Sequence, residues 1–168
     1  MRVVLYMAIS ANGMIAKKDD NTSWISATEW NSYSSMVRGA GCLIVGKRTY
    51  HILTAQPEFS EFKDVKLVVV SNNDFPILSP NHQVADSPKK ALELLEDFDT
   101  AIVAGGGILN ASFLKEELVD EVYLDIEPVI LGNGIKLFNG DDFEVKLELL
   151  ETKQLSSNEL QLHYKIVK

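Results

Sequence analysis

Cysteine and histidine are scarce in this sequence, and their scarcity argues against several kinds of site. The single Cys42 lies in an apolar run and is predicted to be a small core residue rather than a nucleophile. A lone buried thiol fits a reducing compartment, so we expect a cytoplasmic protein. The three histidines His51, His82 and His163 are scattered, and no Cys-x-x-Cys or His-x-His grouping occurs. We therefore expect no dedicated metal site.

Excess positive charge and long apolar runs are also lacking. The 168 residues carry a net charge of −8, which argues against a general nucleic-acid binder. A few local cations would still suffice to bind one anionic cofactor. The apolar run Val3–Ile9 ends at polar residues, and no run reaches the ~18 residues of a membrane span. With no repeat or linker visible, residues 1–168 are predicted to form a single domain that binds neither nucleic acid nor membrane.

What the sequence does contain is an alternation of apolar runs with helical patterns. The runs 3–9, 42–45, 66–70 and 101–104 are typical of strands buried on both faces of a sheet. A weak strand is predicted near 83–85 and a further strand at 121–126. Helices are predicted after residues 26, 46, 87 and 107, and the third of them extends to Glu96. The segments 143–149 and 160–166 alternate strictly, which predicts a one-sided antiparallel hairpin. The predicted fold class is α/β, three-layered, with a mostly parallel central sheet and an antiparallel C-terminal hairpin.

The stretch Gly105–Gly107 reads as a glycine turn between a strand and a helix. Glycines let a ligand lie on the backbone, and a helix N-terminus offers unpaired N–H groups to phosphate. The alternative is a tight turn that binds nothing. A Walker A loop is excluded because no Gly-Lys-Ser/Thr follows. A Rossmann fingerprint fits poorly, since Asn110 occupies the position of the third glycine.

Two further strand ends carry turn and polar residues at the edge of the sheet where ligands bind. Asn12-Gly13 follows the first run, and Gly46–Thr49 follows the second. The polar loop 17–23 after the first of these is either a mobile lid or an ordinary surface connection. The sequence therefore predicts three strand-end blocks that contribute to one site.

Taken in order, these blocks resemble the dihydrofolate reductase fold. They read Ala8-x-Ser10-x-Asn12-Gly13-x-Ile15-Ala16, Val45-Gly46-Lys47-Arg48-Thr49-Tyr50 and Gly105-Gly106-Gly107. The sequence is most similar to the branch that contains the reductase domain of the riboflavin-biosynthesis deaminase-reductase, through Trp24-Ile25-Ser26, Arg38 and Pro128-x-x-Leu131-Gly132. The resemblance covers Leu5 to about Phe138. It implies a dihydrofolate reductase-like fold and a pyridine-nucleotide reductase that uses NADPH and forms a homodimer.

The resemblance also implies which residues bind NADPH. The diphosphate is expected at Gly105, Gly106 and Gly107, with Ile108 and Leu109 opening the helix, and the nicotinamide near Ala8 and Ile15. The 2′-phosphate is expected at Gly46, Lys47, Arg48, Thr49, Ser71 and Asn72. Two adjacent cations with hydroxyl and amide donors suit a dianionic phosphate. The alternative for Lys47 and Arg48 is a solvated surface pair.

The substrate half of the site offers three candidate catalytic residues. Asn12 would contact the substrate or the ribose through its amide. Glu29 is either the proton donor or only the last residue of a capping box that begins at Ser26. Asp125 is either a semi-buried acid with a raised pKa or a strand-end ion pair. Riboflavin-pathway reductases carry Glu at the position of Ala104, which predicts a diverged substrate.

We therefore expect an NADPH-dependent reductase that transfers a hydride to a small heterocyclic substrate, pterin-like or ribosylaminopyrimidine-like, or to a carbonyl compound. A non-catalytic NADP(H)-binding module is the alternative, and a plain oligomeric scaffold is a third possibility.

Overall fold

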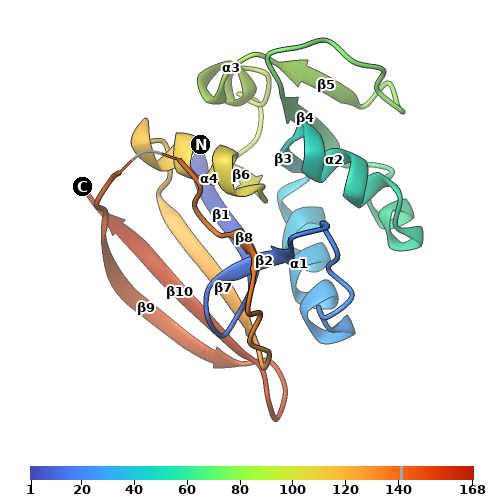
Figure 1. Ribbon diagram of the computed structural model, residues 1–168. Coiled ribbons are helices and arrows are strands. Elements are labelled where there is room, and N and C mark those ends of the chain that lie inside the picture. The colour runs from blue at the N-terminus through green and yellow to red at the C-terminus, as the bar shows by residue number, and fades with distance from the viewer. Residues whose placement is uncertain (141) are drawn as a thin grey trace.

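The computed structural model describes residues 1–140 and 142–168 and contains an eight-stranded sheet with helices on both faces (Figure 1). Its strands run in the order β5-β4-β3-β6-β1-β7-β10-β9. Their bounds are β1 (Arg2–Ser10), β3 (Cys42–Gly46), β4 (Lys66–Val70), β5 (His82–Ala85), β6 (Thr100–Val103), β7 (Glu121–Glu127), β9 (Lys146–Gln154) and β10 (Leu160–Val167). The helices are α1 (Ala27–Ala40), α2 (Lys47–Thr54), α3 (Pro88–Glu93), α4 (Gly107–Lys115) and the 3-10 helix η1 (Pro57–Phe62).

The sheet is parallel except at its C-terminal hairpin, as predicted. β1 pairs in parallel with β6 and β7, whereas β10 runs antiparallel to both β7 and β9. Successive β1 side chains alternate between two cores, because neighbouring residues of a strand point to opposite faces. Val3 and Leu5 join the core under α3 and α4, while Val4 and Tyr6 join the core under α1 and α2. The three predicted layers are therefore present.

Several local predictions were incomplete or wrong. A two-stranded sheet of β2 (Met14–Lys17) and β8 (Gly134–Lys136) was not predicted, and neither was η1. Helix α3 ends at Glu93 instead of Glu96, and the hairpin begins at residue 146 instead of 143. The hairpin is not buried on one face along both strands. Ile166 of β10 is buried, but Leu147 and Leu149 of β9 are 44% and 54% exposed because β9 is the outermost strand.

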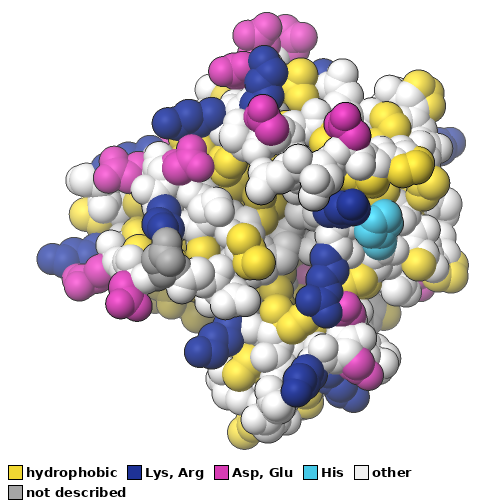
Figure 2. Space-filling model, turned by 45° about the horizontal axis from the view of Figure 1, so that its top comes forward, with side chains coloured by type: hydrophobic (Ala, Val, Ile, Leu, Met, Phe, Trp, Pro, Cys, Tyr) yellow, Lys and Arg dark blue, Asp and Glu magenta, His cyan; other side chains and the backbone are white. Residues whose placement is uncertain are grey.

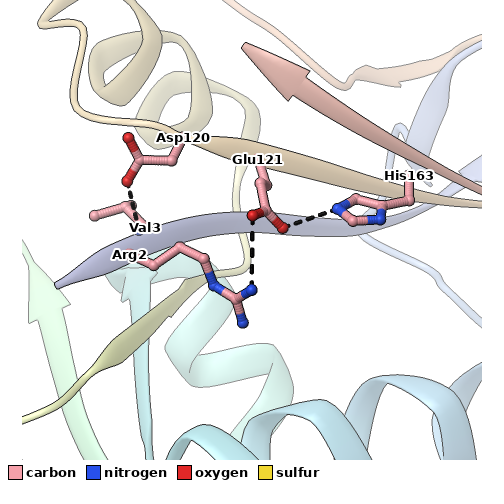
Figure 3. Close-up of polar contacts among 5 residues, drawn as sticks. All are labelled: Arg2, Val3, Asp120, Glu121 and His163. Atoms are coloured by element: carbon pink, nitrogen blue, oxygen red, sulfur yellow. Dashed lines mark hydrogen bonds and ion pairs between the residues drawn. The ribbon is translucent and has the colours of Figure 1, made fainter. Parts of the chain in front are cut away.

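Charged side chains join the amino-terminal ends of the central strands (Figure 3). The Val3 N–H donates to Asp120 Oδ2 over 2.9 Å, and Glu121 lies between Arg2 and His163. The Glu121 carboxylate is 3.6 Å from Arg2 Nη1 and 2.8 Å from His163 Nε2. These contacts link β1, β7 and β10 at the end of the sheet opposite the predicted site. Among the described helices, none is both long and apolar enough to cross a bilayer.

Candidate active site

Two helices begin side by side at the carboxyl ends of neighbouring strands. α2 follows β3 and α4 follows β6, with Gly46 and Gly106 as their N-cap residues. The Gly46 N–H donates to the Gly105 carbonyl oxygen over 2.7 Å, which joins the two turns. Within residues 1–140 and 142–168, no side chain caps either helix. Their unpaired N–H groups and positive dipole ends therefore meet at one edge of the sheet, which suits a ligand with phosphate groups.

The three glycines of the turn between β6 and α4 have different structural roles. Gly105 has a φ of +86°, which disfavours other residues, and its peptide bond to Gly106 is cis. A Cβ on Gly106 would lie 3.3 Å from Thr49 Oγ1, so this glycine brings the second and third blocks together. A Cβ on Gly107 would lie only 2.4 Å from the Lys136 carbonyl oxygen. The packing of the end of β8 and of the residues after it therefore explains glycine at position 107 without invoking a ligand.

The two predicted phosphate-binding cations lie at the start of α2 and already have partners. Lys47 Nζ is 5.0 Å from the centre of the Phe75 ring. Arg48 donates from Nε and Nη2 to Asp20 Oδ2, both at 2.7 Å, which ties α2 to the polar loop 17–23. The Arg48 side chain is still 67% exposed, so an incoming anion can reach it. Figure 2 shows Lys and Arg side chains flanking a hollow in one face of the molecule, with a histidine beside two of them.

The remaining predicted cofactor residues lie around the same edge. Val70 at the end of β4 pairs with Gly46, which places Ser71 and Asn72 beside the second block. Ser71 Oγ donates to the Asn73 carbonyl oxygen over 2.8 Å and shapes that turn. Ile108 is 70% exposed at the start of α4, whereas Leu109 is buried in the core. Leu109 can therefore offer a ligand its backbone only.

The first block forms a rigid turn between β1 and β2. Ala8 and Ile15 are buried. The Asn12 side chain clamps the segment after β7: its Nδ2 donates to the Leu131 carbonyl oxygen over 2.7 Å, and its Oδ1 accepts from the Leu131 N–H over 3.1 Å. Ser10 Oγ also donates to Asn12 Oδ1 over 2.8 Å. Asn12 thus ties the first block to the Pro128–Gly132 segment.

Glu29 does not complete the predicted capping box. Ser26 Oγ accepts from the Glu29 N–H over 3.0 Å, which is the expected half of the box. The Ser26 N–H, which a box would pair with Glu29, instead donates to Glu127 Oε1 over 2.8 Å. The Glu29 carboxyl is buried without serving as a cap. Burial and the nearby charges of Asp125, Glu127 and Glu159 raise its pKa well above the ordinary value.

Asp125 lies in an enclosed hydrogen-bond network and forms no ion pair among the described residues. It pairs with Ala8 across β1 and β7, so its side chain shares the α1 face with Tyr6. Tyr6 Oη donates to Asp125 Oδ2, and Gln161 Nε2 donates to Asp125 Oδ1 over 2.8 Å. Burial raises the pKa of Asp125, although these hydrogen bonds and one to Ser32 oppose the shift. This direction agrees with the semi-buried acid expected from the sequence, whereas the alternative of a strand-end ion pair does not fit, because Asp125 is buried and forms no ion pair among the described residues.

Several residues close to Asp125 and Glu29 were not predicted from the sequence. Glu127 lies two positions after Asp125, so the period of two along a strand could have placed it on the same face. Tyr6 could have been found in the same way, since it precedes Ala8 by two. Gln161 lies in β10, and no pattern in the sequence connects it with Asp125. In the described part of the chain, no group of three or more His, Cys, Asp or Glu side chains is placed to hold a metal ion.

Comparison with known proteins identifies the family of this chain. The family model described as RibD C-terminal domain matches residues 1–160. The chain belongs to this family. The uncharacterized protein YwjB of Bacillus subtilis (strain 168) is 33% identical over 170 residues, which cover 97% of each chain. The predicted family resemblance is thereby confirmed.

Two solved structures show the fold of this family. A putative riboflavin biosynthesis protein from Shewanella sp. PV-4 matches with a TM-score of 0.81 and 18% identity, covering 100% of both chains. A diaminohydroxyphosphoribosylaminopyrimidine deaminase/5-amino-6-(5-phosphoribosylamino)uracil reductase from Thermotoga maritima matches with a TM-score of 0.73 and 16% identity. That match covers 99% of this chain and 56% of the Thermotoga chain. The dihydrofolate reductase-like fold is therefore confirmed.

Proposed function

We propose that this member of the RibD C-terminal domain family is an NADPH-dependent reductase of a small heterocyclic or carbonyl substrate. The observation that supports this best is the meeting of two uncapped helix N-termini beside Lys47 and Arg48, on a sheet against which the carboxyls of Glu29 and Asp125 are also buried. Family membership and the reductase named in the Thermotoga protein support an oxidoreductase of the riboflavin-pathway type.

The residues present fit the phosphates of NADPH. The backbone at Gly105 and Gly106 and the start of α4 would hold the diphosphate, which carries negative charge toward the helix dipole. Lys47 and Arg48 would hold the 2′-phosphate, for which Arg48 would exchange Asp20 for phosphate oxygens. Ala8 and Ile15 would exclude water from the face of the nicotinamide. When bound, NADPH supplies the hydride.

The chain's own part in the reaction is the supply of a proton. Glu29 is nearly buried, and its raised pKa keeps a proton on the carboxyl at a pH where an exposed glutamate has lost it. Glu127 holds the start of α1 by accepting from Ser26, so Glu29 is not needed as a cap. Asp125 is fully enclosed by its partners, which favours a positioning role, because a proton donor must reach the substrate.

A titration of NADPH and NADH, followed by cofactor fluorescence, tests the cofactor assignment. In Lys47→Ala/Arg48→Ala, affinity for NADPH is expected to fall about 100-fold, because charged hydrogen bonds contribute about 1.5–3 kcal/mol each. Affinity for NADH, which lacks the 2′-phosphate, should change little. Equal binding of both nucleotides by both proteins would refute the assignment. Binding without oxidation across pterins, ribosylaminopyrimidines and carbonyl compounds would instead support a non-catalytic NADP(H)-binding module.

Asp20→Asn tests the same phosphate-binding assignment, but here the NADPH affinity is expected to rise instead of fall. The substitution removes the carboxylate that holds Arg48, so NADPH affinity is expected to rise. The gain should be no more than about fivefold, since exposed ion pairs contribute about 0.2–1 kcal/mol. The matched control is Asp19→Asn, which changes the neighbouring exposed acid, whose carboxylate accepts from the Asn21 N–H while Asp20 binds Arg48. Weaker NADPH binding in Asp20→Asn would show that Asp20 supports the site and does not compete with phosphate.

A further inference from the structure

Helix α1 is tied to the sheet by hydrogen bonds at two points, and Glu29 lies between them. At the start of the helix, the Ser26 N–H donates to Glu127 Oε1 over 2.8 Å. Further along, Ser32 Oγ joins the hydrogen-bond network around Asp125. Glu29 is three residues from both Ser26 and Ser32 in sequence, and it is only 5% exposed. Its carboxyl is therefore enclosed in the layer between α1 and the sheet, close to the carboxyls of Asp125 and Glu127.

The neighbouring carboxyls of Glu29 and Asp125 differ in their hydrogen-bond donors. Asp125 has two of them: Tyr6 Oη donates to Oδ2, and Gln161 Nε2 donates to Oδ1 over 2.8 Å. Tyr6 keeps its proton and so remains a donor, because burial and the charge of Asp125 raise the pKa of its hydroxyl. Among residues 1–140 and 142–168, no group donates a hydrogen bond to the Glu29 carboxyl. Because donors stabilise the ionised form of a carboxyl, Asp125 is the one of the two that ionises first.

The charged groups that act on Glu29 are all carboxyls. They are Asp125 and Glu127 of β7 and Glu159, which directly precedes β10. Each of them opposes a negative charge on Glu29, and burial opposes it further. The nearby hydroxyl of Tyr33 stays uncharged, since burial and Glu29 raise its pKa. At Asp125, by contrast, the hydrogen bonds work against the effect of burial. Two buried acids whose surroundings differ in this way take different protonation states.

We propose that Asp125 acts through Glu29, as a buried negative charge that keeps the Glu29 carboxyl protonated at neutral pH. Tyr6 and Gln161 are then positioning residues, because their hydrogen bonds hold the charge on Asp125. This role rests on the proposed function, in which Glu29 is the proton donor. It also gives the enclosed Asp125 a part in the reaction that needs no contact with the substrate.

Carboxyl-carbon NMR of the ligand-free full chain between about pH 4 and pH 9 tests the proposal, because both carboxyls titrate in or above the lower part of this range. In the wild type at neutral pH, Asp125 is expected to be ionised and Glu29 protonated. Asp125→Asn removes the charge and nearly preserves the shape. At a given pH it should lower the ratio of protonated to ionised Glu29 about tenfold, as expected for the loss of a close like charge. The signal that disappears in Glu29→Gln identifies Glu29.

Glu121→Gln is the matched control for Asp125→Asn. It removes a carboxylate from the same strand, at the end of the sheet where Glu121 contacts Arg2 and His163 (Figure 3). The titration of Glu29 should be the same in this variant as in the wild type.

Tyr6→Phe tests the hydrogen-bond donor without removing a carboxyl. Asp125 loses one donor, so it should keep its proton to higher pH, and Glu29, which then faces less charge, should lose its proton at lower pH. A general loosening of the packing would instead admit water and lower the titration midpoints of both carboxyls. Circular dichroism reports whether each variant is folded, and Tyr6→Phe decides the matter if Asp125→Asn does not fold.

The pH profile of turnover separates a positioning role of Asp125 from proton donation. With a compound that the wild type reduces, Asp125→Asn should lose turnover at alkaline pH and regain the wild-type rate at acid pH, since Glu29 is still present. Loss of turnover at every pH would make Asp125 the donor and overturn the proposal. An ionised Glu29 beside a protonated Asp125 in the wild type would also overturn it, as would a Glu29 titration that Asp125→Asn leaves unchanged.

The carboxyl signals need neither cofactor nor substrate. A chain that reduces no pterin, ribosylaminopyrimidine or carbonyl compound would refute the proposed function, and the titration would still decide whether Asp125 controls the protonation of Glu29.

Discussion

Replacing Glu29 by glutamine is expected to stabilise the protein at neutral pH and to abolish most of its turnover. The ionised carboxylate is destabilising in the fold because it is nearly buried beside Asp125, Glu127 and Glu159. A glutamine of the same shape removes that charge. It also removes the proton that Glu29 would donate, so turnover should fall about 100- to 10,000-fold, which is the usual contribution of a general acid.

The Glu29 carboxyl is also expected to make the free energy of unfolding depend on pH. The pKa of Glu29 is raised above its ordinary value of 4.5 in the fold, so the folded protein retains a proton that the unfolded chain has released. The free energy of unfolding of the wild type should therefore decrease as the pH rises through this window. Burial of Asp125 acts in the same direction. In Glu29→Gln the free energy of unfolding should depend less steeply on pH. Its gain over the wild type should be largest at the highest pH measured.

Thermal unfolding of the wild type and of Glu29→Gln between about pH 5 and pH 8 measures this difference in pH dependence. The range begins just above the ordinary pKa of a carboxyl group, where an unfolded glutamate has lost its proton. Glu58→Gln, at an exposed position in η1, is the matched control and should leave the slope unchanged. Turnover is measured as NADPH oxidation with whichever pterin, ribosylaminopyrimidine or carbonyl compound the wild type reduces. Full turnover in Glu29→Gln would show that Glu29 is not the acid, and the same result in Asp125→Asn would remove the second candidate.

Alanine at position 107 is expected to cost about 3 kcal/mol of folding free energy, even without a ligand. The added Cβ would lie 2.4 Å from the Lys136 carbonyl oxygen and 3.3 Å from Asn139 Cβ. The first of these is backbone, which cannot rotate away as a flexible side chain does. Displacement would also disturb the contacts of this segment, since the Asn139 N–H donates to Gly107 and the Leu137 N–H donates to Gly13.

Urea unfolding of the ligand-free protein measures this cost, and another glycine provides the control. Gly39 lies within α1, and a Cβ there would have no neighbour within 4 Å. Gly39→Ala should therefore raise stability by about 0.5–1 kcal/mol, because alanine favours the helix. A change below about 0.5 kcal/mol in Gly107→Ala would contradict the packing role. The glycine would then be explained by a ligand alone.

The sequence predicts the central part of this fold well for a physical reason. β1, β3, β4 and β6 are buried on both faces, so each is a continuous apolar run that ends at a turn signal. β2 and β8 are only four and three residues long and were missed, since so short a run has no readable period. The exposure of β9 was missed because the alternation of Leu147 and Leu149 shows a possible buried face but not whether anything covers it.

In the site as well, local motifs were predicted from the sequence, whereas contacts between distant residues were not. The three strand-end blocks were found because each is local, with glycine or polar residues directly after an apolar run. Glu29 is left without the capping role because Glu127 accepts from the Ser26 N–H across 101 residues of sequence. Gln161 reaches Asp125 across 36 residues. Contacts of this kind depend on strand order, which the pattern of a single sequence does not contain.

The central position of β1 has a consequence for how the chain is made. β1 pairs with β6 and β7, and its Arg2 and Val4 lie beside Thr100 and Glu121. During synthesis β1 therefore leaves the ribosome well before either neighbour exists, and its apolar residues must stay unpaired until they arrive. Contacts so distant in sequence also make folding slow. The strand on which the site is built is thus the one that waits longest for its partners while the chain is being translated.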